Sequence, residues 1–318
     1  MEKPFLYKVE PNAENLKTMQ QQYHEVRGHP AFLREFLACN PSSNAIRMLL
    51  NHPEFISWAE DGSFVLMPNY PYIDREALEK DPKHYKNRKE GLSLNAWFVH
   101  PKQLEESVFS NPEIRSNPSL IQQSYSYAPS LEKTSDVARL ADQQRIREME
   151  QESGVRYFAS VLDLKKEDVA WLKNLKAKAL ENLQKEYSVD SSDKVDLFFH
   201  GLISLGTTTL HLHVRVNQKI SAVEKQNSIG LDEIISGLES GKNAADILGE
   251  HEVIYHSIAK EDFPKVSEGT VRVKNPFTPA RGFEAILTEG ISSLLEVPQR
   301  IFADMVGGNY SSVATSRV

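Results

Sequence analysis

Residues 210–217 read Leu-His-Leu-His-Val-Arg-Val-Asn, a strict alternation of apolar and polar side chains. Successive side chains of a β-strand point to opposite faces, so this alternation predicts a strand with one face in the core. The apolar side chains would enter the core. The opposite face would carry a polar row formed by His211, His213, Arg215 and Asn217.

Three interpretations account for the polar row. A strand that faces solvent shows the same alternation without any further role. A metal site would use the two histidines, but it needs a third ligand, and the first acidic residue that follows is Glu224. In a phosphate site, the neutral imidazole of His213 would attack phosphorus, while Arg215 and His211 would line the site.

The segment before the strand favours the phosphate site. Residues 206–214 read Gly-Thr-Thr-Thr-Leu-His-Leu-His-Val, which resembles the signature of the histidine-triad (HIT) superfamily. The resemblance implies that His213 is the nucleophile, that His211 supports it, and that Thr208 contacts or protonates the leaving group. The alternative is that residues 207–209 form only a β-prone turn. His200 would face the same groove as His213 if the two strands pair antiparallel.

Within that superfamily, the order of elements is similar to the C-terminal domain of the scavenger mRNA decapping enzyme. The similarity covers residues 154–217 well, residues 61–68 in isolation and residues 218–265 loosely. It implies an α+β fold with a HIT-like antiparallel sheet and packed helices. It also implies hydrolysis of a phosphoanhydride through a nucleotidyl-histidine intermediate, with no metal or other cofactor. HIT proteins commonly pair, so the resemblance further implies a homodimer.

The chain departs from the family pattern in two places. Arg215 stands where the motif has its third histidine, and a guanidinium does not shuttle a proton at neutral pH. Residues 69–153 do not match the family's cap-stacking segment, although Tyr70, Tyr72 or Trp97 could stack on a base instead. The base, the sugar and the leaving group therefore stay open.

The remaining patterns divide the chain into three parts. Residues 1–60 are predicted to form a helical N-terminal region, because apolar residues recur at helical spacing. Residues 61–265 form the HIT-like domain with a long insertion at about 69–153, and residues 266–318 form a C-terminal extension with a helix at 283–295. Residues 110–135 are expected to be a surface loop. Further predicted elements are strands at 64–67, 96–99, 155–161, 195–200 and 252–258, and helices at 135–151, from 163, at 231–238 and at 243–248.

Composition narrows the function further. The formal net charge is −7 and no basic stripe is present, which argues against binding to long nucleic acid. The chain has no run of roughly eighteen apolar residues and no basic-then-apolar leader, so neither a membrane span nor secretion is expected. Its single cysteine, Cys39, cannot form an internal disulfide, which fits a cytoplasmic protein.

The leading hypothesis is a nucleotide hydrolase that cleaves a cap-like or other dinucleoside polyphosphate through His213. One alternative is a non-catalytic nucleotide- or cap-binding module in which Arg215 marks lost activity. Another is an interaction protein on a HIT scaffold, whose partner would bind the insertion or the C-terminal extension. The hypothesis requires that residues 210–217 form a strand and that the His213 ring is open to a cleft.

Overall fold

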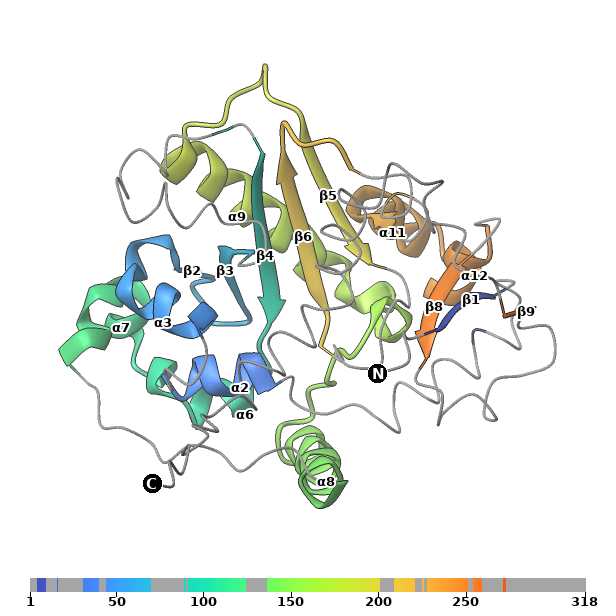
Figure 1. The fold of residues 1–318 in the computed structure, drawn as a ribbon. Coiled ribbons are helices and arrows are strands. Elements are labelled where there is room, and N and C mark those ends of the chain that lie inside the picture. The colour runs from blue at the N-terminus through green and yellow to red at the C-terminus, as the bar shows by residue number, and fades with distance from the viewer. Residues whose placement is uncertain are drawn as a thin grey trace, which may run out of the picture.

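A computed structural model describes residues 5–9, 16, 31–39, 44–69, 89, 91–123, 136–200, 209–220, 225, 228–250, 254–258 and 271–272. Its centre is a six-stranded antiparallel sheet (Figure 1). This sheet confirms the predicted α+β class and the strands expected near 64–67, 96–99, 195–200 and 210–217. The strands lie in the order β2 (Ser57–Trp58), β3 (Phe64–Pro68), β4 (Leu92–Phe98), β6 (His211–Val216), β5 (Val195–His200) and β7 (Ser228–Gly230).

Strand β6 lies between β4 and β5, and its side chains alternate between the two faces as predicted. On one face, Leu212, Val214 and Val216 are 0% exposed. Removing such side chains from water is the main source of stability in a core of this kind. Their cross-strand partners are also apolar: Leu92, Leu94, Ala96, Val195, Leu197 and Phe199.

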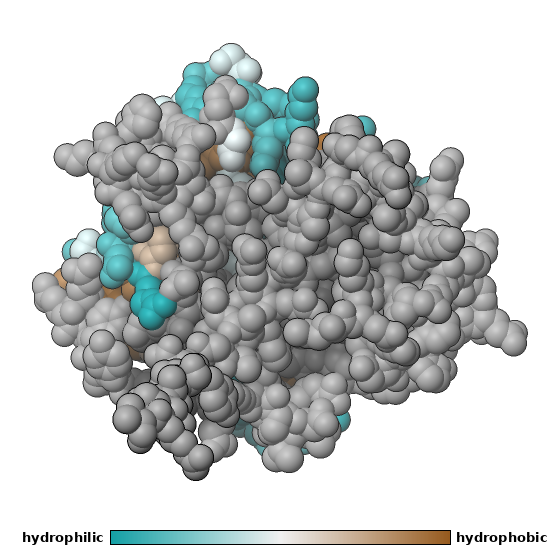
Figure 2. All heavy atoms as spheres, in the orientation of Figure 1, coloured by the Kyte–Doolittle hydropathy of each residue, from teal (hydrophilic) through white to brown (hydrophobic). Residues whose placement is uncertain are grey.

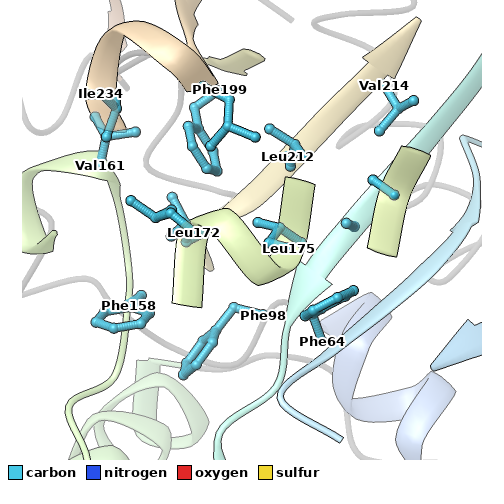
Figure 3. Packing of buried hydrophobic residues seen from close by; sticks show 14 of the residues in the cluster. Phe64, Phe98, Phe158, Val161, Leu172, Leu175, Phe199, Leu212, Val214 and Ile234 are labelled. Carbon is cyan, nitrogen blue, oxygen red and sulfur yellow. The ribbon is translucent and has the colours of Figure 1, made fainter. Parts of the chain in front are cut away.

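Helix α9 (Val169–Tyr187) packs on this apolar face, where Leu172 and Leu175 lie close to Leu212 (Figure 3). Burial of each large apolar side chain contributes about 1.5–3 kcal/mol, so this helix–sheet contact holds the centre of the fold together. The helix ends at Ser188, which adopts the left-handed conformation with φ of 53°. The buried stripe of the helix follows its three- and four-residue spacing and consists of Leu172, Leu175, Ala179, Leu183 and Tyr187.

The segment before α9 differs from the prediction of a strand followed at once by a helix. Residues 154–160 form no strand. The reason is that Asp163 Oδ2 accepts hydrogen bonds from the backbone N–H groups of Ala159 and Ser160, at 2.8 and 3.1 Å. Because a side chain satisfies these amides, they need no neighbouring strand. The helix is then preceded by two 3₁₀ turns, η5 (Val161–Asp163) and η6 (Lys166–Asp168).

The other face of β3 and β4 packs on a second apolar cluster, which includes Val65 and Met67. Two of the predicted N-terminal helices are confirmed and contribute to this cluster: α2 (Ala31–Leu37) and α3 (Asn44–Asn51). The expected surface loop at 110–135 is wrong in its first part, because Ile114 and Ile121 are buried in the same cluster. Four short elements lie in this part of the fold: η1 (Pro53–Phe55), η3 (Val108–Ser110), α7 (Pro112–Ser116) and η4 (Pro118–Gln123).

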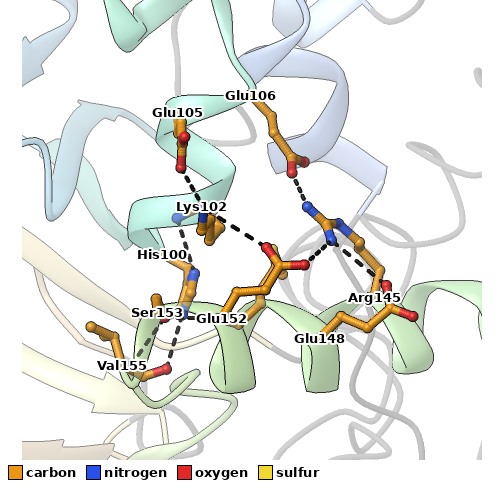
Figure 4. Close-up of polar contacts among 10 residues, drawn as sticks. His100, Lys102, Glu105, Glu106, Arg145, Glu148, Glu152, Ser153 and Val155 are labelled. Carbon is orange, nitrogen blue, oxygen red and sulfur yellow. Dashed lines mark hydrogen bonds and ion pairs between the residues drawn. The ribbon is translucent and has the colours of Figure 1, made fainter.

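Helix α8 (Asp136–Ser153) confirms the helix predicted at 135–151, and polar contacts attach it to α6 (Pro101–Glu105) and the residue that follows (Figure 4). Arg145 of α8 contacts Glu106, and Lys102 Nζ of α6 lies 3.8 Å from Glu152 Oε2 of α8. These groups are largely exposed, so each pair contributes little, about 0–1 kcal/mol.

A buried histidine stands at the start of α6 beneath that network. His100 is 0% exposed, and its Nε2–H donates to the backbone carbonyl of Val155 at 3.0 Å. Its Nδ1 accepts a hydrogen bond from the N–H of Lys102 at 3.2 Å, which caps the helix. Burial lowers the pKa of His100, so its ring is neutral with the proton on Nε2.

Two helices confirm the predictions for residues 231–238 and 243–248: α11 (Leu231–Glu239) and α12 (Ala244–Gly249). A second sheet has the order β8 (Ile254–Ile258), β1 (Phe5–Val9) and β9 (Val271–Arg272). Strand β1 was not predicted, because its partners lie some 250 residues away in the chain. The helix predicted at 283–295 lies outside the described residues. Within the described part of the chain, no helix is long and apolar enough to cross a membrane.

Candidate active site

The polar row of β6 lies in the middle of the six-stranded sheet, on the face opposite α9. His213 lies opposite Asn95 of β4 and Phe198 of β5. The same face therefore carries side chains from three neighbouring strands, all at fixed register. The other cross-strand neighbours are Ser93 and Trp97 on β4 and Asp196 on β5.

His213 is buried between aromatic rings. Its ring is 5% exposed and stacks on Phe198, with centroids 5.3 Å apart and planes inclined by 11°. The ring of His200 lies 3.8 Å from it. The expectation that the His213 ring is open to a cleft is therefore not met, because the rings of β5 pack directly against it.

The burial of His213 keeps its imidazole neutral. Desolvation lowers its pKa well below the ordinary 6.5, and electrostatic repulsion involving His200, His211 and Arg215 lowers it further. Its Nε2 has no hydrogen-bond partner within the described residues. A buried polar atom without a partner is rare in native proteins and is often found where a ligand or water binds.

His211 has a defined orientation. Its Nδ1 lies 2.9 Å from the backbone carbonyl oxygen of Thr209, and this oxygen can only accept, so Nδ1 carries the proton and donates it. The ring stacks on Trp97, with centroids 4.3 Å apart. Burial lowers the pKa of His211 to about 4. Trp97 thus supports a histidine and is 8% exposed, which argues against its predicted use as a base-stacking platform.

Arg215 is 1% exposed and lies behind His213. Its Nη1 donates to Ser93 Oγ at 2.6 Å, and its Nη2 lies 3.3 Å from His213 Nδ1. The guanidinium also lies 5.7 Å from the centroid of the Phe198 ring, a cation–π distance. In this arrangement, Arg215 contacts the histidine that was predicted to be the nucleophile, and its guanidinium is not presented to solvent.

Of the other predicted site residues, His200 faces the same region as His213, as its place on the antiparallel strand β5 predicted. Asn217 does not join them. Its Oδ1 accepts from the N–H of Lys194 at 2.9 Å, and its Nδ2 donates to Asp193 Oδ1 at 2.8 Å. Its side chain is therefore used to close the turn before β5, about 13 Å along the strand from His213.

The turn closed by Asn217 is a polar end of the sheet rather than a ligand site. Lys89 Nζ contacts Asp190 and Asp193, both at 2.8 Å, and holds this end of the sheet to the segment before β4. Figure 2 shows hydrophilic side chains gathered over this end, at the top of the molecule. The predicted site residues Thr208, Tyr70 and Tyr72 lie outside the described residues.

The structure adds Asn95 to the candidate site. It is 6% exposed, it faces His213 across the strand pair, and its Oδ1 has no hydrogen-bond partner within the described residues. Sequence reasoning missed it, although Ser93 and Asn95 already interrupt the apolar run of β4 with the period of a strand. Among the described residues, no group of three or more His, Cys, Asp or Glu side chains gathers as metal ligands would.

An antiparallel sheet with a long helix across one face and a His-x-His strand at its centre is consistent with a HIT-like fold. Residues 155–229 match the family model described as "Scavenger mRNA decapping enzyme C-term binding". The matched segment holds α9, β5 and β6, which confirms the resemblance found in residues 154–217. No curated protein matches the chain significantly. The matched family model is named after a decapping enzyme.

Proposed function

We propose that this protein is a nucleotide hydrolase that cleaves a phosphoanhydride, with cap-like and other dinucleoside polyphosphates as substrates. The observation that carries the proposal is the neutral imidazole of His213, whose Nε2 has no hydrogen-bond partner within the described residues. A neutral imidazole is a competent nucleophile toward phosphorus at neutral pH. The family match at residues 155–229 supports the same chemistry.

The charges around His213 favour an anionic ligand. Arg215 is a permanent cation, and its charge helps to lower the pKa of both His211 and His213. The same positive field stabilises a phosphate group that enters the site, and also the extra negative charge that builds on its oxygens in the transition state. The chemistry needs no further group to supply positive charge.

The proposed reaction has two steps. In the first, His213 carries its ring proton on Nδ1 and attacks phosphorus with the lone pair of Nε2, an N–P bond forms, and the bond between phosphorus and the bridging oxygen breaks. The leaving nucleotide or phosphate departs with the electron pair of that bond. In the second step, a water oxygen attacks the same phosphorus and the N–P bond breaks. One water is consumed, its oxygen ends on the released nucleotide, and its protons pass to the products.

The proposal requires that the polar face opens when a ligand binds, because His213 is 5% exposed. The rings that cover it from β5 stack against it, with His200 at 3.8 Å and Phe198 at 5.3 Å between centroids. Such contacts contribute about 0.5–1.5 kcal/mol each, which a bound nucleotide can replace.

A turnover assay tests the proposal. The full chain is incubated with a methylated cap dinucleotide and with diadenosine polyphosphates, and products are separated by chromatography. Wild type is expected to cleave at least one of them, and His213→Asn to lose at least about 10³-fold in rate. His52→Asn is the matched control, because the His52 ring contacts Glu54 and Phe55 and no residue of β6, and it should keep full activity. A folded wild-type protein that cleaves no phosphoanhydride would refute the proposed hydrolase activity.

A second candidate is a nucleotide- or cap-binding module without turnover. The contact between Arg215 Nη2 and His213 Nδ1 favours it, because it occupies a nitrogen of the proposed nucleophile. This candidate predicts that calorimetry detects nucleotide binding while product formation is absent. The homodimer, the cytoplasmic location and a protein partner at residues 69–153 or 266–318 stay predictions.

A further inference from the structure

We propose that Arg215 favours the tautomer of His213 with the proton on Nε2, and so slows attack on phosphorus, because Nε2 has no lone pair until Arg215 releases Nδ1. This inference rests on the proposed function for its consequences, but the tautomer itself is a property of the free protein. In this inference Arg215 is a positioning residue. It acts through His213 and slows the first chemical step, the attack on phosphorus.

The direction of one hydrogen bond leads to this assignment. A guanidinium has five N–H donors and no acceptor, so Arg215 Nη2 can only donate to His213 Nδ1, 3.3 Å away. A neutral imidazole carries one proton on one of its two nitrogens. Because Nδ1 accepts, the proton of His213 resides on Nε2.

His211 gives the opposite result two residues earlier on the same strand. Its Nδ1 faces the carbonyl oxygen of Thr209 at 2.9 Å, which can only accept, so its proton resides on Nδ1 and its lone pair on Nε2. The two histidines of the row thus have opposite tautomers, each set by the partner of its Nδ1.

The tautomer of His213 decides what its Nε2 can do. With a proton on Nε2, the ring donates a hydrogen bond to a phosphate oxygen but has no lone pair there for attack. Attack requires that Arg215 releases Nδ1 and that the proton moves to it. The release is opposed by the bond from Nη1 to Ser93 Oγ at 2.6 Å and by packing against Phe198.

The size of the restraint follows from the type of bond. A hydrogen bond from a charged donor corresponds to a bias of about tenfold to about 100-fold between the two tautomers. We therefore expect the wild-type chain to turn over substrate more slowly, by a factor in that range, than a variant in which residue 215 does not donate to His213 Nδ1. A side chain that can accept from Nδ1–H at position 215 should remove the restraint.

Nitrogen NMR on the full chain labelled with ¹⁵N-histidine tests the tautomer directly. The expected result is an Nε2–H ring for His213 and an Nδ1–H ring for His211, with signals assigned from His213→Gln and His211→Gln. His100 is an internal reference, because its contacts with Val155 and Lys102 require Nε2–H. A proton on Nδ1 of His213 would overturn the inference.

Two variants test the restraint. Arg215→Gln introduces an amide oxygen that accepts from Nδ1–H, so the Nδ1–H tautomer and about tenfold or greater acceleration of cleavage are expected. Arg215→Lys keeps a donor-only cation and is expected to keep Nε2–H. An Arg215→Gln protein that is folded, shown by an unchanged His100 signal, and has the Nδ1–H tautomer but cleaves no faster than wild type would contradict the restraint. If Arg215→Gln does not fold, the wild-type spectrum alone decides.

The outcomes separate this inference from the proposed function. If wild type and Arg215→Gln both fail to cleave while His213 shows Nε2–H, the hydrolase fails and the tautomer assignment stands. If wild type cleaves rapidly and His213 shows Nδ1–H, the hydrolase stands and the assignment fails.

Discussion

The loss of stability on acidification tests the burial of the two histidines of β6, His211 and His213. The size of this loss in the free energy of unfolding can be worked out for His211. Burial lowers the pKa of His211 from its ordinary 6.5 to about 4 in the folded protein. Between these values, the unfolded chain binds a proton that the folded protein does not. Stability contributed by the neutral ring is therefore full above pH 6.5 and falls as the pH drops toward 4.

The difference between the two pKa values corresponds to about 3 kcal/mol, at ~1.4 kcal/mol for each pKa unit. The pKa of His213 is lowered in the same direction, so the wild-type loss includes both rings. A comparison with His211→Asn isolates the contribution of His211. The stacking on Trp97 that the variant lacks is lost at every pH, so it cancels in the difference between two pH values.

The assay is urea denaturation of wild type and His211→Asn at pH 7 and pH 4, at constant ionic strength. Wild type is expected to lose about 3 kcal/mol more than the variant between the two pH values. Equal losses in the two proteins would show that the His211 ring is not held neutral by burial, and would refute the electrostatic description of the site.

Three further predictions concern the core, the site and the turn. Leu212→Ala, at a position that is 0% exposed, should lower the free energy of unfolding by about 2–5 kcal/mol in urea titrations, and a loss below about 1 kcal/mol would contradict its packing against α9. Asn95→Leu should leave stability equal or raise it by about 1 kcal/mol, because it removes a buried acceptor without a partner, while nucleotide affinity measured by calorimetry falls. Lys89→Met should raise the pKa of Asp193 toward its ordinary value, as observed by carboxylate NMR, and an unchanged pKa would contradict the contact between the two groups.

Much of the sheet could be predicted because its signal is local. The alternation in residues 210–217 and the stripe of α9 follow directly from the geometry of strands and helices. The strand predicted at 155–161 does not form, for a local reason that periodicity does not reveal. The carboxylate of Asp163 accepts hydrogen bonds from backbone N–H groups of this segment. Strand β1 was not predicted for a non-local reason, because it forms by pairing with β8 and β9, which are far away in the chain.

The amino-acid sequence by itself determined the chemistry available on β6: two imidazoles and a guanidinium on one face, with aliphatic side chains on the other. Only the tertiary structure decided how those groups are used. It buried His213 against rings from β5, added Asn95 from β4, and directed Arg215 toward the ring of His213. The physical reason is that alternation depends on neighbours along one strand. Burial, pKa and tautomer depend instead on contacts between strands that are far apart in the chain.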